Sequence, residues 1–312
     1  MLLQYYTGFD PRKPDFLITS NNQLSNNHYR TFGFYGHPLT IASVGLAYFS
    51  FFWTLFWQWV VLKKEQKIKY IPFQNNQILQ ALCLLSISLF NLGAVFTSVG
   101  RTATVIGMLF LILIPLFFIK KKKVFFLISF LFLCSALSLF AFKKVGFEER
   151  LNNSVNVEQV KNHPIDGDYR LVFWKTYVEM IKEKPLLGFG SYWIDHGIRD
   201  YFYDNLGYEK IPQKYNAHNN YLEILACVGF FGAFAILFCL YQILKIFRFS
   251  FRKKNNNNLL SIAFSVSLLA NLFHSFTQNV FFDSSVTYIY LSLLLILTWQ
   301  NFVYQSHLQK SV

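Results

Sequence analysis

Charged residues are scarce in this sequence. Asp, Glu, Lys and Arg make up 14% of its 312 residues, whereas about 25% is usual in a soluble chain. Apolar residues account for 54% and aromatic residues for 20%. Long runs with almost no charge recur along the chain, and such runs are typical of helices that cross a membrane. We therefore expect an all-α, polytopic helical membrane protein with about seven transmembrane helices, at 38–62, 77–96, 102–119, 124–142, 220–244, 259–279 and 286–304.

Cysteine is scarce as well. The four cysteines all lie inside expected spans, and none has the spacing of metal ligands. We expect small apolar core residues at Cys83, Cys134, Cys227 and Cys239, no metal site and no cofactor. We also expect no secretory signal within the first 37 residues given, because "MLLQYYTGFDPRKP" has neither a basic start nor an apolar run.

The net charge of +13 is concentrated after alternate spans. The opposite short connections hold only Arg101 and Asp283. This is the positive-inside pattern, which orients the chain and directs the basic excess to the cytoplasm and to anionic lipid. Membrane lipids are therefore the expected partners of this charge, and nucleic acid is not. The basic residues concerned are Lys63, Lys64, Lys67, Lys69, Lys120, Lys121, Lys122, Lys123, Lys245, Arg248, Arg252, Lys253 and Lys254, with Glu65 the only acid among them.

This orientation predicts a large polar segment outside the membrane between the fourth and fifth spans. The segment carries equal numbers of basic and acidic residues, and its length exempts it from the charge rule. An outer N-terminal stretch without a preceding span is unusual, so either the first span is a reversed anchor or further helices lie upstream. The expected parts are the outer stretch 1–37, a four-helix membrane block 38–142, the outer loop 143–219, a three-helix membrane block 220–304 and a cytoplasmic tail 305–312.

The outer loop contains one amphipathic pattern. Asp168 is a suitable N-cap and Pro185 a stop signal. We expect the aromatic face of this helix to lie on the membrane surface, and residues 199–217 to form an aromatic, polar loop. The apolar residues at the spacing of one helix face are Leu171, Trp174, Tyr177, Val178 and Ile181.

Three arginines and two histidines are expected at the outer membrane surface. They are Arg30, Arg101, Arg170, His218 and His274. Ionisable residues near a membrane are costly and point to function. Structural roles are the alternative: an arginine can bind lipid phosphate, snorkel or pair on a solvated surface, and His274 can be an interhelical hydrogen-bond partner.

His218 is the best candidate for a catalytic group. Asn220 and Glu223 resemble an asparagine variant of the capping box, which would begin a helix at residue 220 or 221 and would account for Glu223. A histidine just outside that positive helix end is favoured in its neutral form. Neutral imidazole is the form that accepts a proton.

The arginines suit a lipid-linked diphosphate. A guanidinium group binds phosphate oxygens in a bidentate fork and keeps its charge. When the diphosphate leaves, arginines neutralise the growing negative charge without a metal ion. With a histidine base, this set predicts glycosyl transfer from a polyprenyl-diphosphate donor at the outer leaflet.

Four stretches carry a family resemblance: "AHNNYLEILACVGFFGAFAILF", "RLVFWKTYVEMIKEKPLLGFGSYWI", "SVGRTATVIG" and "YRTFGFYGHP". The first resembles a His-Asn-x-Tyr-Leu signature with paired glycines, and the second an Arg…Trp…Pro-Leu-Leu-Gly-x-Gly segment. Their order, and the large outer loop, are similar to those of the bacterial O-antigen ligase and Wzy-type polymerase superfamily. The resemblance covers roughly 25–300.

The resemblance implies a fold like that of C-type glycosyltransferases, in the bacterial inner membrane with a periplasmic active face. It implies an undecaprenyl-diphosphate-linked glycan as donor and a lipid A-core or glycan as acceptor, without metal. Arg30 and Arg170 would bind the diphosphate, Arg101 would support them, and His218 would be the base. The accessory residues would be Asn219, Tyr221 and His274.

The chain departs from the family pattern in three places. An adjacent Ser-Arg pair is here Ser98-Val-Gly-Arg101, and Cys227 replaces an acidic residue. Family members usually have further helices upstream, so this chain is expected to be a fragment or to work with a second polypeptide. A polysaccharide polymerase is the close alternative to a ligase. A non-catalytic transporter of lipid-linked glycan is the more distant one, although its ionisable residues would lie near the bilayer midplane.

Overall fold

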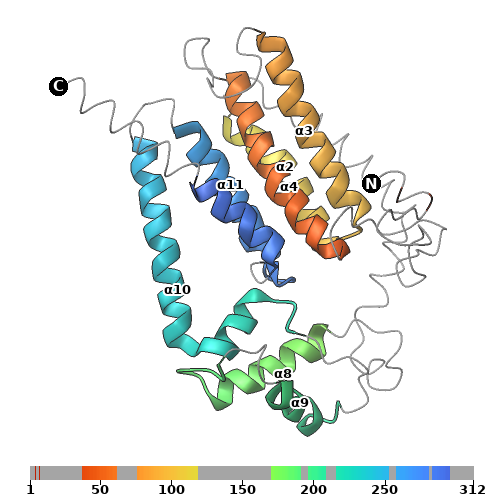
Figure 1. Cartoon of the computed structure of the whole chain (residues 1–312), viewed down its shortest axis with the longest axis vertical. Helices are drawn as coiled ribbons and strands as arrows, with labels where there is room; N and C mark the ends of the chain where they lie inside the picture. Colours follow the sequence, from red (N-terminus) through yellow and green to blue (C-terminus); the bar gives the residue numbers. More distant parts are fainter. Residues whose placement is uncertain are drawn as a thin grey trace. The chain divides into compact units, whose positions relative to one another are not determined.

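The structure is a computed structural model of the chain (Figure 1). The chain divides into two compact units, each of which is considered by itself. Unit 1 comprises Met1–Gly146, Lys245–His274 and Asp283–Val312, and unit 2 comprises Phe147–Leu244 and Ser275–Phe282. The residues that the structure describes are 4, 7, 37–61, 76–118, 170–190, 196–208, 216–252, 258–280 and 283–295.

Within the described residues, four helices are long and apolar enough to cross a membrane. They are α2 (Pro38–Val61), α3 (Gln77–Thr97) and α4 (Arg101–Phe118) in unit 1, and residues Asn220–Phe238 of α10 (Asn220–Arg252) in unit 2. They coincide with four of the expected spans, and they indicate a membrane protein. The part of the chain that the structure describes contains no strand.

Of the three remaining expected spans, two are covered in part and one lies outside the described residues. Span 259–279 corresponds to the shorter helix α11 (Asn258–His274), which ends before residue 279. Span 286–304 begins with an apolar helix, Ser284–Leu295. Span 124–142 and residues 296–304 lie outside the described residues, as do nearly all of 1–37, the first part of the outer loop (143–169) and the tail 305–312.

Helix α2 forms the centre of unit 1. It packs against α3, α4 and α11, and the four helices are seen together in Figure 1. Trp53 Nε1 on α2 donates a hydrogen bond to Leu111 O on α4 over 3.3 Å. Most of the core residues are apolar, as expected where helices associate by close contact within a membrane. The core residues are Ala42, Leu46, Phe49, Trp53, Leu92, Val95, Ala103, Ile106, Phe110, Leu111, Ile114 and Ala270.

A buried polar network links α2, α11 and the helix Ser284–Leu295. Asn271 Nδ2 donates to Tyr290 OH at 2.8 Å and to Ser43 O at 3.2 Å. Tyr290 OH in turn donates to Ser267 O at 2.8 Å, and Ser267 Oγ donates to Ala47 O at 2.8 Å. Polar side chains that hydrogen-bond across helices hold membrane bundles together. This network therefore fixes the register of the three helices.

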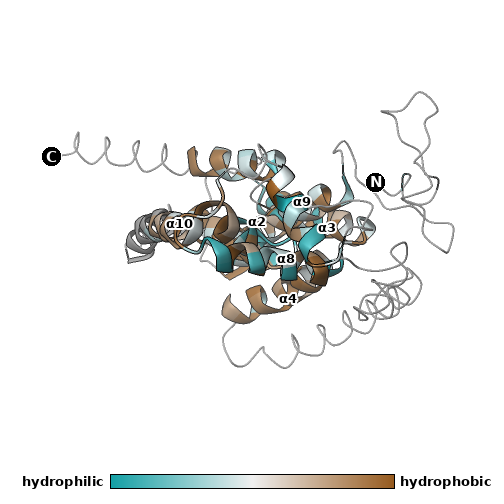
Figure 2. Cartoon of the chain, turned by 90° about the horizontal axis from the view of Figure 1, so that it is seen from below, coloured by the Kyte–Doolittle hydropathy of each residue, from teal (hydrophilic) through white to brown (hydrophobic). Residues whose placement is uncertain are grey.

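Unit 2 is more polar than unit 1. Its helices are α8 (Arg170–Glu183), α9 (His196–Asn205) and the first part of α10. In Figure 2 the ribbon of α8 and α9 includes teal, hydrophilic residues, whereas the ribbon of α4 in unit 1 is mostly brown and hydrophobic. Two apolar clusters pack these helices together: Val172, Phe173, Tyr203 and Tyr208 in one, and Tyr177, Met180, Phe202, Ala217 and Ala226 in the other.

The apolar face expected for α8 differs in part from the face that packs within unit 2. Tyr177 is buried, whereas Leu171 and Val178 are exposed by 43% and 37%, and Trp174 Nε1 donates to Ala217 O at 3.0 Å. Contact of this helix with the membrane surface stays a prediction. The buried face is rotated, because α8 packs against α9 and α10 through its aromatic and apolar residues. The residues on this face are Val172, Phe173, Thr176, Tyr177 and Met180.

The expectation of a loop over 199–217 is also wrong in its first part. Residues His196–Asn205 form α9, and Phe202 and Tyr203 are buried against α8 and its neighbours. The apolar positions of this helix are few and close together, so its periodicity is weak. Burial of its aromatic residues by the rest of unit 2 stabilises it instead.

We predict that Tyr290→Phe destabilises unit 1. The variant loses the hydroxyl that accepts from Asn271 and donates to Ser267 O, and bonds of this kind in membrane bundles contribute about 0.6–2 kcal/mol. Unfolding in mixed detergent micelles measures the change. Tyr288→Phe, on the same helix but 67% exposed, is the matched control and should leave stability unchanged. Equal stability of both variants would contradict a structural role of the network.

Candidate functional site

The site begins with His218, in the short connection before α10. Its backbone is left-handed, with φ at 46°, and its N–H donates to Asn216 Oδ1 at 3.2 Å. The imidazole stacks on Phe173 of α8, with ring centroids 6.0 Å apart and planes 29° apart. Its Nδ1 lies 3.3 Å from Gln278 Oε1. The ring is thus held on one face and at one nitrogen by two distant parts of unit 2.

Asn219 is the N-cap of α10. Its Oδ1 accepts from Tyr221 N at 2.9 Å and from Leu222 N at 3.2 Å, which is the usual bonding of a capping asparagine. The helix does start at residue 220, as expected, but the expected cap at Asn220 is wrong. Asn220 is buried and instead bonds to Ser275, through N to O and through Nδ2 to Oγ, both at 2.9 Å.

Glu223 is a buried hub rather than the end of a capping box. Its carboxyl group, 1% exposed, accepts from Ala217 N at 2.9 Å, Asn279 Nδ2 at 3.3 Å and Tyr177 OH at 3.3 Å. Each donor comes from a different segment: the connection before α10, the segment after α11, and α8. The hub therefore ties together the three segments that surround His218.

Two buried phenols stay protonated around this hub. Burial raises the pKa of Tyr177 far above its usual range, and the neighbouring Glu223 raises it further. Burial likewise raises the pKa of Tyr203, against the opposing charge of Arg199. Both groups are therefore neutral hydrogen-bond donors throughout the physiological pH range.

Arg199 was not expected at the site. It lies on α9, is 9% exposed, and its Nε is 3.6 Å from Asp200 Oδ1. Its positive charge is close enough to lower the pKa of both Tyr177 and Tyr203 against the effect of burial. The sequence "GIRDYF" contains no pattern that separates this arginine from those on a solvated surface.

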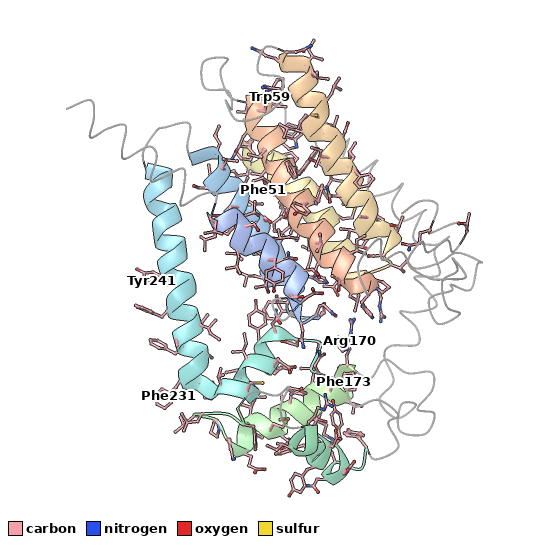
Figure 3. The ribbon with its side chains drawn as sticks, in the orientation of Figure 1. Phe51, Trp59, Arg170, Phe173, Phe231 and Tyr241 are labelled. Atoms are coloured by element: carbon pink, nitrogen blue, oxygen red, sulfur yellow. The ribbon has the colours of Figure 1, made fainter. Side chains whose placement is uncertain are left out.

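Arg170 lies at the same end of α8 as the imidazole. It is the first residue of the helix and is half-buried. Phe173, which stacks on His218, follows one turn later and therefore on the same side of α8. Figure 3 labels both residues at this end of the helix. Tyr221, also half-buried, packs its ring against Phe276 at 4.5 Å between centroids.

The other predicted site residues do not belong to unit 2. Arg101 begins α4 and is half-buried, and His274 ends α11. His274 is 2% exposed and its Nδ1 lies 3.3 Å from Ser43 Oγ on α2, as the interhelical alternative predicted. Arg30 lies outside the described residues. No group of three or more potential metal ligands occurs within the described ranges.

The Pro-Leu-Leu-Gly-x-Gly motif fits into a break in α10. Gly229 has φ at 62° and interrupts the helix, which frees backbone groups on both sides. Phe189 N and Gly190 N donate to Ala226 O and Cys227 O at 2.9 and 2.8 Å. In the other direction, Pro185 O and Leu186 O accept from the two phenylalanine N–H groups that follow the break, at 2.8 and 3.2 Å. The turn 185–190 thus satisfies the groups that the break exposes.

We predict that Gly188→Ala and Gly229→Ala both disrupt this junction. A Cβ atom would meet Cys227 C at 2.5 Å in the first case and Leu186 C at 2.3 Å in the second. Backbone strain at a positive φ adds about 1–3 kcal/mol. The measurement is thermal stability of the purified protein in detergent. Gly207→Ala, with φ at 75° but no atom within 4 Å, is the control and should show the smaller loss; an equal loss in all three would exclude the clash.

Comparison with known proteins identifies the family. Residues 85–238 match the family model described as O-Antigen ligase. The matched segment contains Arg101, Arg170 and His218, and also the turn and the broken helix described above. No curated protein and no solved structure matches the chain. The segment 85–238, just under half of the chain, therefore matches the O-antigen ligase family, and the resemblance seen in the sequence is confirmed for this segment.

Proposed function

We propose that the protein is a glycosyltransferase of the O-antigen ligase type. It transfers a glycan from undecaprenyl diphosphate to an acceptor such as lipid A-core, at the periplasmic face of the bacterial inner membrane. Family membership and the membrane-length helices support a role in O-antigen assembly with lipid-linked substrates. The donor, the acceptor and the roles of single residues are our proposal.

The proposal rests mainly on the contacts of the His218 ring. Phe173 covers one face of the ring, and Gln278 Oε1 lies at hydrogen-bond distance from Nδ1. An amide oxygen accepts but cannot donate, so Nδ1 is the protonated nitrogen in this pairing. The lone pair of Nε2 is then the one that takes a proton from substrate.

The reaction follows from this arrangement. Nε2 of His218 removes the proton of an acceptor hydroxyl, whose oxygen attacks the anomeric carbon of the donor. A new glycosidic bond forms as the bond from that carbon to the diphosphate oxygen breaks, and the electron pair leaves on the diphosphate. Arg170, one helical turn before the Phe173 that stacks on this ring, neutralises the departing charge. Arg30 and Arg101 are proposed to support it, with Asn219, Tyr221 and His274 as accessory residues.

His218→Ala tests the base. We expect the transfer rate to fall about 10²–10⁴-fold, the usual contribution of a positioned general base. The assay measures glycan attachment in membranes that contain the variant and a defined lipid-linked donor. The control His307→Ala, in the expected cytoplasmic tail, should retain activity at equal protein amount. An unchanged transfer rate in His218→Ala would show that His218 is not the base.

Arg170→Lys tests the diphosphate contact. Lysine keeps the charge but loses the planar fork. Since a hydrogen bond to a charged group contributes about 1.5–3 kcal/mol, we expect a roughly 10- to 100-fold lower rate in the same assay. Lys175→Arg, at an exposed position on α8, is the control. An unaffected rate for Arg170→Lys would make Arg170 a surface residue.

A further inference from the structure

An exposed apolar patch surrounds the junction between the turn and the broken helix. On the turn, Leu186 and Leu187 are 57% and 75% exposed. On α10, Phe230, Phe231 and Phe234 are 54%, 63% and 70% exposed. The two groups are adjacent, because the backbone bonds across the break join the turn to the start of the second helical segment. We call these five residues the junction patch.

The character of α10 changes at the break. Before Gly229 the helix carries buried polar residues, Asn220 and Glu223, which bond to other parts of unit 2. After it, the sequence "FFGAFAILF" (230–238) contains no polar side chain, and almost every residue is exposed. Figure 3 labels Phe231 in this segment and Tyr241 three residues after it, both with side chains that point away from the helix axis. A helix that is apolar and uncovered fits a lipid environment.

A break in a helix is tolerated at membrane depth only where its backbone groups are bonded. The turn meets this condition, because it donates two hydrogen bonds to the first helical segment and accepts two from the second. Basic residues flank it: Lys182 and Lys184 are exposed, and Lys184 Nζ lies 4.6 Å above the Phe189 ring. Lysines at the edge of an apolar patch can reach anionic headgroups.

We propose that the junction patch inserts into the outer leaflet of the bilayer and that the membrane-spanning part of α10 begins at the Gly229 break. The occupant of the patch is lipid acyl chain. Residues 220–228 then belong to the polar outer unit, and the expected span 220–244 starts about nine residues too early, roughly 14 Å along a helix. The turn 185–190 becomes a second membrane contact of the outer unit, beside the spanning helix itself. The proposal is independent of the reaction proposed above.

Site-directed spin labelling tests the insertion. A nitroxide is attached at Leu187→Cys in a variant whose native cysteines are replaced by alanine, reconstituted in vesicles of zwitterionic and anionic lipid. We expect a several-fold higher accessibility to oxygen, which concentrates in the acyl chains, than to a water-soluble nickel chelate. The control label at Tyr201→Cys, on α9 and 57% exposed, should show the opposite preference.

Two results would overturn the proposal. Preference of the Leu187 label for the nickel chelate would place the turn in water, and low accessibility to both reagents would mean that protein covers it. Should the cysteine-free variant not fold, Leu187→Trp in the native background replaces it. Lipids brominated on their acyl chains should then quench the added fluorescence, and a lack of quenching would also reject the insertion.

Discussion

The carboxyl group of Glu223 is the contact on which unit 2 depends. It lies in a buried position and accepts hydrogen bonds from α8, from the connection before α10 and from the segment that follows α11. These segments are far apart in the sequence, and an apolar cluster that includes Tyr177 and Ala217 packs beside the carboxyl group. Burying a carboxyl group without hydrogen-bond donors is unfavourable in free energy. The three segments therefore stabilise the Glu223 carboxyl group, and its hydrogen bonds fix their positions in turn. Two of its donors, Ala217 and Asn279, immediately adjoin His218 and its partner Gln278, so that the hub also sets the position of the imidazole.

The helix break explains why two sequence motifs occur together. The paired glycines of α10 and the Pro-Leu-Leu-Gly-x-Gly segment are about forty residues apart, and each is unremarkable alone. In the structure, the break in α10 leaves carbonyl and N–H groups without partners in the helix, and the backbone of the turn 185–190 provides two donors and two acceptors for them. Gly188 and Gly229 approach the opposite backbone too closely for a side chain. The two motifs together therefore fix the turn that follows α8 against the first part of α10.

Hydropathy predicted much of unit 1 and less of unit 2. Helices α2, α3 and α4 lie within a residue or two of their expected bounds, because the length of an apolar run is a local property. The buried face of α8, the existence of α9 and the true cap at Asn219 were missed, since each is decided by contacts with distant segments. His218 and Arg170 were chosen as candidate site residues from residue type and motif. Gln278, Arg199 and Tyr177 were not chosen, because only the fold brings them into this part of unit 2. Glu223 was attributed to the helix cap, although an acid in an otherwise apolar helix is unusual.

The left-handed backbone at His218 has a consequence for how this position can vary. A histidine in that conformation costs about 1–2 kcal/mol compared with glycine. Stability of the fold therefore favours glycine at position 218, whereas the proposed base requires histidine. Variants selected in the laboratory for heat resistance alone are expected to lose the imidazole.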